Sequence, residues 1–474
     1  MGSILKASKE LVTPSTPLIP GYSPLTPLDQ YMVRVILPVL CVFEIKDSSL
    51  SLKKTILNNL KQGLSRTIDD MPAIAAYVVT DSEVQESIRL KYDNDAGVWF
   101  HTKDVSHVDY DSLKRRSFPF TALPVEDFVP EPRGHSSKAP VLTAQAAFIQ
   151  GGLVLTFNGH HAAMDAQGLG TFVQVWARHV AAVSQGRVVA SEHRLGLDSL
   201  DGSSIYAPVM RRPWAEFPTF WQSNDRTYEA AQKEVMDAAM SGNFSKLATL
   251  LRLTNWIIDE DKLHQLRQQA SPQSKSESAV TDNAALSALI WMHLSRARGL
   301  VKRHVGTSSL FTAINCRRRM NPPLAPNYPG NCIVLARATA TSTELEASES
   351  QSLHGIAQLV ADSLDWWAPD EIWSLTGAIQ AHPNVRNALV PPMDYDVVVT
   401  SPSRLADSLS AATWGEELGG ITAIRFAFPA WIDGFAVVLP SVQGGFEITL
   451  WTSPDTANRL LADEGWCRWV RQLE

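Results

Sequence analysis

The stretch Leu153-Val154-Leu155-Thr156-Phe157-Asn158-Gly159-His160-His161-Ala162-Ala163-Met164-Asp165-Ala166-Gln167-Gly168 carries the strongest structural signal in the sequence. Its apolar first half predicts a buried strand, and Asp165 is suited to cap the helix that follows. Two histidines stand between these elements, and Asp165 comes four residues after the second. A histidine at such a junction is held at the edge of a sheet, where α/β folds place ligands. Because imidazole titrates near neutral pH, His161 is the candidate general base.

A β-hairpin is predicted to deliver the two histidines. Residues 141–149 and 153–157 form its strands, and Gly151-Gly152 forms its turn. Neighbouring residues of a strand point to opposite faces, so we assign a structural role to His160. The predicted helix after Asp165 has a regularly spaced apolar face, which consists of Leu169, Phe172, Val173, Trp176 and Val180.

The spacing of His161 and Asp165 is weak evidence by itself, because the chain has 12 histidines. His107 and Asp111 repeat this spacing in a charged stretch that we interpret as a solvated loop. From its context alone, His161 is explained equally well by catalysis and by a core histidine bonded to the backbone. The sequence contains no GxSxG, HExxH, Walker or Rossmann pattern, so a serine hydrolase or zinc protease has no support.

Length and composition restrict the class of protein. The 474 residues, of which 45% are hydrophobic and 19% charged, predict a globular protein of about two or three domains. A net charge of −7 argues against a nucleic-acid partner. No apolar run is long enough for a membrane span, and the start shows no signal-peptide pattern, so we expect a cytoplasmic protein. The four cysteines lack metal-site spacing, so we expect free thiols and no metal.

Strands and helices alternate along the rest of the chain, which predicts a mixed α/β fold with much antiparallel pairing. A proline-rich arm (residues 11–28) is expected to be extended rather than helical. Residues 195–226 lose periodicity and are interpreted as a crossover between domains. The other predicted strands are residues 31–43, 97–101, 308–314, 396–400, 435–439 and 446–451, and the main predicted helices start near Ser49 or Ser51 and span 282–300 and 353–366.

Several ordered blocks resemble the BAHD family of CoA-dependent acyltransferases, and the likeness is greatest to its fungal branch of trichothecene 3-O-acetyltransferases. His161 to Asp165 matches the HxxxD motif of that family, with Ala166 in place of the usual glycine. The most specific block is NCRRRMNPPLAPNYPGN at residues 315–331, and NAALSALIWMHLSRAR at residues 283–298 resembles a family helix. The opening PSTPLIPGYSPLTPLDQ is similar to the fungal N-terminus.

The resemblance implies two domains of the chloramphenicol-acetyltransferase type with a channel between them. The N-terminal domain would comprise residues 1–195 and carry the HHxxxD motif, a crossover linker would comprise residues 196–228, and the C-terminal domain would comprise residues 229–474. One internal segment of the C-terminal domain can belong to the sheet of the other domain. Acetyl-CoA, as a co-substrate rather than a tightly bound cofactor, would reach His161 from one end of the channel and the acceptor from the other.

The resemblance also implies roles for individual residues. Asp165 would brace its loop through a salt bridge to Arg317 or, alternatively, Arg319. The late DFGWG motif of the family is reduced to Trp414-Gly415, and the family's Thr/Ser-Ser-Trp appears as Thr400-Ser401-Pro402, without the tryptophan. Thr400, Trp414 or a backbone N–H would contact the oxyanion or the acceptor. Lys275, Ser276 and Ser278 would bind CoA phosphates, although a polar loop explains these three residues as well.

We therefore expect a monomeric O-acyltransferase that transfers an acyl group, most simply acetyl, to a hydroxyl of a small, largely apolar secondary metabolite. Two alternatives stay open at the level of the sequence. One is a condensation-like enzyme that takes its acyl donor from a carrier protein. The other is a repurposed member of the family that binds a metabolite without acylating it. N-acylation of an amine is a variant of the main hypothesis.

Overall fold

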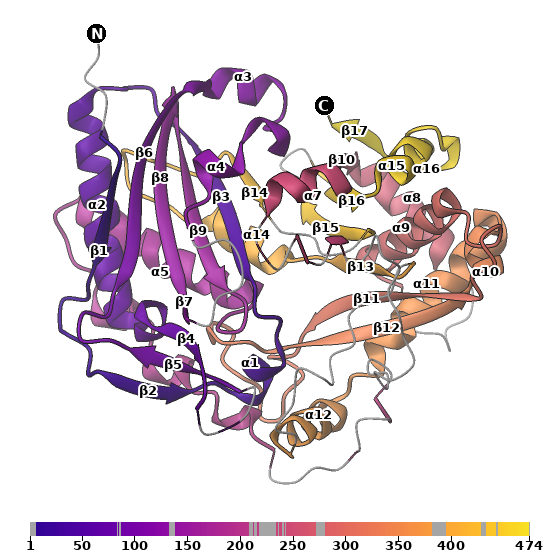
Figure 1. Ribbon diagram of the computed structural model, residues 1–474, viewed down its shortest axis with the longest axis horizontal. Coiled ribbons are helices and arrows are strands. Elements are labelled where there is room, and N and C mark those ends of the chain that lie inside the picture. Colours follow the sequence, from indigo (N-terminus) through magenta and orange to yellow (C-terminus); the bar gives the residue numbers. More distant parts are fainter. Residues whose placement is uncertain are drawn as a thin grey trace.

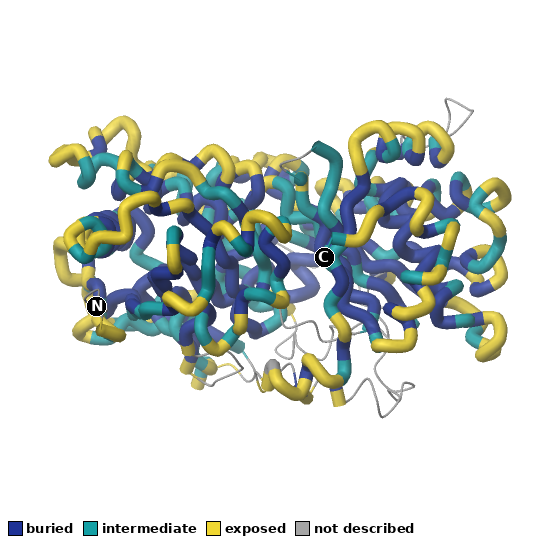
Figure 2. Tube along the Cα trace, turned by 90° about the horizontal axis from the view of Figure 1, so that it is seen from above, coloured by how far each residue is buried: buried dark blue, intermediate teal, exposed yellow. Residues whose placement is uncertain are grey.

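The computed structural model describes residues 6–82, 84, 87–131, 138–207, 212, 216–217, 234–235, 237–238, 241, 243–271, 280–381, 395–427, 433–441 and 444–473. These residues form two large α/β halves that lie side by side (Figure 1). Buried chain runs through the centre of both halves, and the exposed loops lie at the outside (Figure 2). In this part of the chain, no helix is long and apolar enough to cross a membrane.

The first half is built on a six-stranded sheet with the order β1-β6-β8-β9-β3-β14. Its central strands are apolar and buried on both faces, as the continuous hydrophobic runs predict. Strands β3 and β9 are antiparallel, and Ile36 at the start of β3 pairs with His160 at the end of β9. The strands are β1 (Ser8–Val12), β3 (Ile36–Glu44), β6 (Val98–Asp109), β8 (Leu142–Gln150), β9 (Gly152–His160) and β14 (Ala423–Phe426).

Two long helices, α2 (Leu50–Asp70) and α5 (Ala166–Ser184), cover one face of this sheet (Figure 1). They approach closely because Gly63 has no side chain, and a Cβ there would overlap with Val180. The indole N–H of Trp176 donates to the carbonyl of Leu60 across the same contact, at 3.0 Å. The shorter helices of this half are α1 (Pro27–Tyr31), α3 (Tyr110–Arg115), α4 (Val125–Phe128), η1 (Pro72–Ala75) and η2 (Phe120–Ala122).

A separate four-stranded sheet has the order β2-β5-β4-β7. Its strands are β2 (Gly21–Pro24), β4 (Tyr77–Thr80), β5 (Ile88–Tyr92) and β7 (Lys138–Pro140). Short 3-10 turns follow α5. They are η3 (Ser191–His193), which precedes the expected crossover, and η4 (Leu197–Leu200) and η5 (Ser203–Ile205), which lie in its described part.

The second half is built on a seven-stranded sheet with the order β12-β11-β13-β15-β16-β10-β17. Helix α9 (Asp282–Arg298) is the centre of its core and is buried on almost all sides. The strands are β10 (Arg252–Ile258), β11 (Thr307–Asn315), β12 (Ile333–Thr341), β13 (Val397–Thr400), β15 (Phe435–Pro440), β16 (Phe446–Thr452) and β17 (Arg471–Leu473). The remaining helices are α7 (Phe244–Leu250), α8 (Glu260–Ala270), α10 (Ser342–Glu346), α11 (Glu349–Asp365), α12 (Pro369–Ala381), α14 (Ser403–Ala411), α15 (Pro454–Leu461) and α16 (Glu464–Trp469).

The C-terminal half of the chain contributes to both halves of the molecule. Strand β14 pairs with β3 in the first sheet, and α14 packs on α5. Gly170 permits the second contact, because a Cβ at this position would lie 2.9 Å from Oγ of Ser408. A simple division of the chain at residue 228 therefore misses the segment around α14 and β14, which belongs with the first core.

Three sequence expectations need correction. The arm at residues 11–28 is not extended throughout, because α1 starts at Pro27 with Thr26 as its N-cap. His107 lies in β6 rather than in a loop, since this strand continues to Asp109, although its side chain is 68% exposed. The strand expected over residues 31–43 starts only at Ile36, because Tyr31 ends α1.

Candidate active site

His161 is the first residue after β9, and hydrogen bonds hold its backbone on both sides. Its N–H donates to the carbonyl of Val35 at 2.8 Å. Its carbonyl accepts a hydrogen bond from Nδ2 of Asn331, also at 2.8 Å. His160 is 3% exposed, and its Nδ1 accepts the N–H of Ala162. The structure thus keeps His160 inside the turn and leaves His161 partly exposed.

The environment of the His161 ring favours the neutral imidazole. Burial lowers the pKa of His161, while the charge of Asp165 and the side chain of Asn331 oppose this effect. Nδ1 of His161 is buried and has no hydrogen-bond partner among the described residues. A neutral imidazole retains a lone pair that accepts a proton, which is the state that a general base requires at neutral pH.

Asp165 is almost fully buried, and hydrogen bonds saturate its carboxylate. It is the N-cap of α5, where Oδ1 accepts the N–H of Gly168 at 2.9 Å. Oδ2 accepts the N–H of Cys332 at 2.9 Å. Arg317 donates to both oxygens, at 2.8 and 2.9 Å. With both oxygens occupied in this way, Asp165 orders the loop and does not serve as a proton acceptor for a substrate.

Arg317 connects this loop to the second half of the molecule. It follows β11 and, besides Asp165, donates to the carbonyls of Tyr328 and Gly330. Arg319, the alternative partner considered for Asp165, instead donates to the carbonyls of Leu364 and Trp367. Gly168 allows the two segments to touch, since a Cβ there would overlap with the carbonyl oxygen of Pro329.

Asp29 is a residue near the site that sequence reasoning did not single out. Its Oδ1 accepts both the backbone N–H and the Nδ2 of Asn331, at 2.9 and 2.8 Å. Its Oδ2 accepts the N–H and hydroxyl of Thr26 in a capping box. The sequence does indicate the capping role of Asp29, because Thr26-Pro27-Leu28-Asp29 has the spacing of a capping box, with proline at the first helical position.

Thr400 and Trp414, the two side chains suggested to contact the oxyanion or the acceptor, lie in different parts of the structure. Thr400 is half-buried at the end of β13, which runs parallel to β11 and therefore ends on the same side as Asn315. Trp414 is fully buried and packs edge-on against Phe43 and Trp176. Phe43 lies seven residues along β3 from the partner of His160, roughly 23 Å away. Trp414 is thus a core residue, distant from His161.

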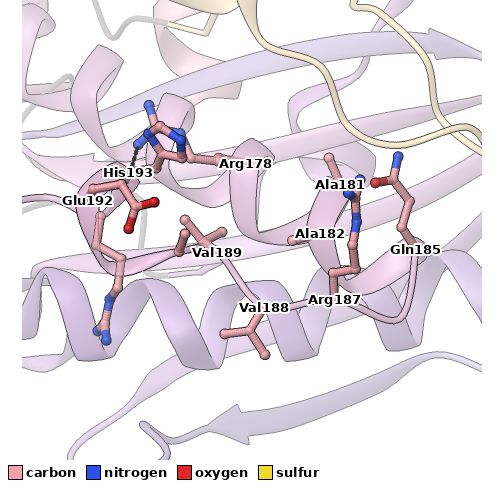
Figure 3. A pocket seen from close by; sticks show the side chains of 11 residues that line it. Arg178, Ala181, Ala182, Gln185, Arg187, Val188, Val189, Glu192 and His193 are labelled. Carbon is pink, nitrogen blue, oxygen red and sulfur yellow. Dashed lines mark hydrogen bonds between the residues drawn. The ribbon is translucent and has the colours of Figure 1, made fainter.

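Lys275, Ser276 and Ser278, suggested for CoA phosphates, lie outside the described residues. A surface cavity of about 660 Å³ is lined by Arg178, Arg187, Val188, His193 and Arg194, among others (Figure 3). Its lining on α5 begins at Arg178, 13 residues after the N-cap Asp165, which is about 20 Å along the helix from the His161 loop. This cavity is distinct from the site at His161.

Comparison with known proteins decides the family. A model of the Transferase family matches residues 3–452, which is nearly the whole chain. The chain belongs to this family, the BAHD acyltransferases. It is 27% identical to Acyltransferase easC of Emericella nidulans, over 96% of each chain. It is 24% identical to O-acetyltransferase ptmV of Penicillium ochrochloron, over 96% of this chain and 98% of the relative.

Several solved structures share the fold of this chain. F. graminearum TRI101, solved with coenzyme A and T-2 mycotoxin, superposes with a TM-score of 0.79 at 19% identity and covers 96% of this chain and 100% of its own. Vinorine synthase superposes with a TM-score of 0.63, also at 19% identity, over 99% of this chain and 98% of its own. The predicted family and mixed α/β fold are therefore confirmed, and the chain is an acyltransferase.

Proposed function

We propose that this acyltransferase transfers an acetyl group from acetyl-CoA to a hydroxyl of a small, largely apolar secondary metabolite. The observation that carries the proposal is the setting of His161. His161 is a partly exposed residue whose imidazole has a lowered pKa, and the neighbouring carboxylate is engaged by Arg317. Such a ring can exchange a proton with a substrate, while the acid beside it holds the loop in place.

In the proposed reaction one base, His161, carries out both proton transfers. Nε2 of His161 removes the proton of the acceptor hydroxyl as the oxygen attacks the thioester carbonyl. The tetrahedral intermediate collapses, the C–S bond breaks, and the imidazolium returns the proton to the CoA thiolate. The products are the acetyl ester and free CoA. The buried cysteines near Asp165 are unsuited to covalent catalysis, because burial raises the pKa of Cys316 to about 12 and that of Cys332 well above its usual value.

The negative charge on the tetrahedral intermediate requires a hydrogen-bond donor. Thr400 is the side-chain candidate, since it ends β13 and precedes α14, the helix that packs on α5. A backbone N–H is the alternative donor. Thr400→Val would lower kcat by about 10²-fold if the hydroxyl supplies this bond.

The similar proteins support the choice of substrates. TRI101 of F. graminearum was solved with coenzyme A and either T-2 mycotoxin or deoxynivalenol, and ptmV is named an O-acetyltransferase. Tryptamine benzoyltransferase 1 of Oryza sativa, 26% identical over 75% of this chain, is named for an amine acceptor. The same base would serve an amine, so N-acylation belongs in the test. We further propose a cytoplasmic monomer without a tightly bound cofactor.

The test is CoA release from acetyl-CoA, measured with a panel of hydroxylated and amine acceptors. His161→Ala is expected to lower turnover by about 10²- to 10⁴-fold, the usual contribution of a general base. His107→Ala is the matched control, because His107 has the same spacing to an aspartate and is 68% exposed. Near-normal turnover of a folded His161→Ala enzyme would contradict the assignment.

The melting temperature measured with and without acetyl-CoA, combined with the transfer assay, separates the alternative functions. Acetyl-CoA is expected to raise the melting temperature, because a ligand that binds only the folded state stabilises it. No shift with free acetyl-CoA, together with transfer from an acylated carrier protein, would indicate a condensation-like enzyme. A shift without transfer to any acceptor of the panel would favour a member of the family that no longer acylates.

A further inference from the structure

Asp29 is buried to an extent that capping a short helix does not require. Helix α1 has five residues, yet the Asp29 side chain is 3% exposed, and burial raises its pKa to about 6. A capping carboxylate is usually solvated, and taking a carboxylate out of water is unfavourable unless hydrogen bonds compensate. Asp29 accepts four of them, two from Thr26 and two from Asn331. Two of these four hydrogen bonds therefore come from Asn331, which is 302 positions away in the sequence.

The two bonds to Asn331 determine how its amide group is turned. Nδ2 of Asn331 has two N–H groups, one directed to Oδ1 of Asp29 and one to the carbonyl of His161, both at 2.8 Å. The reversed amide would place Oδ1 of Asn331 against two acceptor oxygens, which is repulsive. The carboxylate of Asp29 thus selects the orientation in which Asn331 holds His161.

The bond from Asn331 completes the fixation of the His161 backbone. The N–H of His161 is already bound to Val35, so the bond from Asn331 holds the remaining polar group of the His161 backbone. Asn331 is completely buried, and its side chain also raises the pKa of the imidazole. Its backbone is held as well, because Asp29 accepts its N–H.

We infer that Asp29 is a positioning residue that acts through Asn331 to hold the His161 backbone, and with it the imidazole, in the reactive geometry. This inference rests on the proposed function of His161. Three segments far apart in the chain meet here, namely the start of α1, the turn after β9 and the loop before β12. A catalytic group that is misplaced by about 1 Å loses on the order of 10²-fold in rate.

The test compares Asp29→Asn with Thr26→Val, a matched control. Thr26→Val removes the hydroxyl that caps α1 and leaves both bonds between Asp29 and Asn331 in place. Asp29→Asn keeps the size of the side chain but cannot accept hydrogen bonds on both sides. We expect kcat for CoA release from acetyl-CoA, with water or the best acceptor, to fall about 10- to 100-fold in Asp29→Asn, with KM for acetyl-CoA unchanged. Thr26→Val is expected to retain kcat even where the melting temperature falls equally.

A double variant tests the link between the two residues. Asn331→Ala removes the bond to His161, so adding Asp29→Asn to it is expected to lower kcat little further. The NMR titration of the His161 ring gives a readout that does not depend on turnover. The pKa of His161 is expected to fall in Asp29→Asn, because the side chain of Asn331 raises it in the wild-type protein.

Equal kcat in Asp29→Asn and Thr26→Val, with an unchanged His161 titration, would overturn the inference and leave Asp29 as a helix cap. Independent effects of Asp29→Asn and Asn331→Ala would overturn the link through Asn331. A wild-type enzyme that releases no CoA would contradict the proposed function instead. In that case the histidine titration still decides whether Asp29 positions His161.

Discussion

Arg317 and Asp165 form a bidentate ion pair across 152 residues of sequence, with N–O distances of 2.8 and 2.9 Å. Both side chains are at most 2% exposed. The pair joins the loop after β11 to the first turn of α5, directly beside the turn that holds His161. One interaction thus connects the two halves of the molecule and orders the candidate base.

Removal of one partner of this pair should be strongly destabilising. Arg317→Met leaves the buried carboxylate of Asp165 without its counter-charge, and such losses cost about 3–5 kcal/mol. We expect the free energy of unfolding, measured with urea, to fall by this amount and activity to fall with it. Arg318→Ala is the control, because the neighbouring Arg318 is exposed. Equal stabilities of the two variants would refute the structural role.

Gly168→Ala should separate the 316–331 loop from α5. The added methyl group would overlap with the carbonyl oxygen of Pro329, and backbone on both sides leaves no side chain free to move. We expect destabilisation of about 1–3 kcal/mol and reduced CoA release. Gly355→Ala, in α11 with open space around it, should be neutral or stabilising. An unchanged melting temperature for Gly168→Ala would show that the loop adapts.

His293 should make stability depend on pH on the alkaline side. The ring is fully buried between Asp463 and Glu349, at 2.6 and 3.2 Å, and these carboxylates raise its pKa against the effects of burial and of Arg296. A folded-state pKa above the unfolded value stabilises the protein fully below about pH 6.5, and this contribution is lost as the pH rises through the folded pKa. Stability should therefore decline above neutral pH.

His293→Gln should remove this decline, measured as the free energy of unfolding between pH 6 and pH 9. His107→Gln, which changes an exposed histidine, should leave the decline in place. The two carboxylates that pair with His293 affect stability at acidic pH instead. The pKa values of Glu349 and Asp463 are lowered, so their contribution is present above about pH 4 and is lost in acid. If the loss of stability between pH 6 and pH 9 persists in His293→Gln, groups other than His293 cause it.

Trp414→Phe should lower stability without impairing catalysis. The ring fills the core between Phe43 and Trp176, so a smaller ring leaves a cavity and is expected to cost about 1–3 kcal/mol. We expect kcat and KM for acetyl-CoA to remain within about twofold of wild type at a temperature where both are folded. A loss of kcat without a loss of stability would place Trp414 in the reaction after all.

Local patterns predicted the elements around His161 well. The hairpin and the apolar face of α5 lie where alternation and helical spacing predicted them, since each depends on residues that are close in sequence. Ser49, one of two predicted caps, caps α2 through the N–H of Leu52. The strand β12 was missed, and the place of β14 in the first sheet could not be assigned from sequence, because sheet pairing brings together residues that are distant along the chain.

The sequence by itself determined the family, the mixed α/β class and the histidine to be tested, because these depend on local periodicity and on ordered motifs. Only the tertiary structure decided that Arg317 rather than Arg319 meets Asp165, that Trp414 belongs to the core, and that Asp29 reaches His161 through Asn331. The physical reason is burial. A carboxylate or an indole inside the protein must be satisfied by whatever groups folding brings to it, and spacing along the chain does not specify those groups.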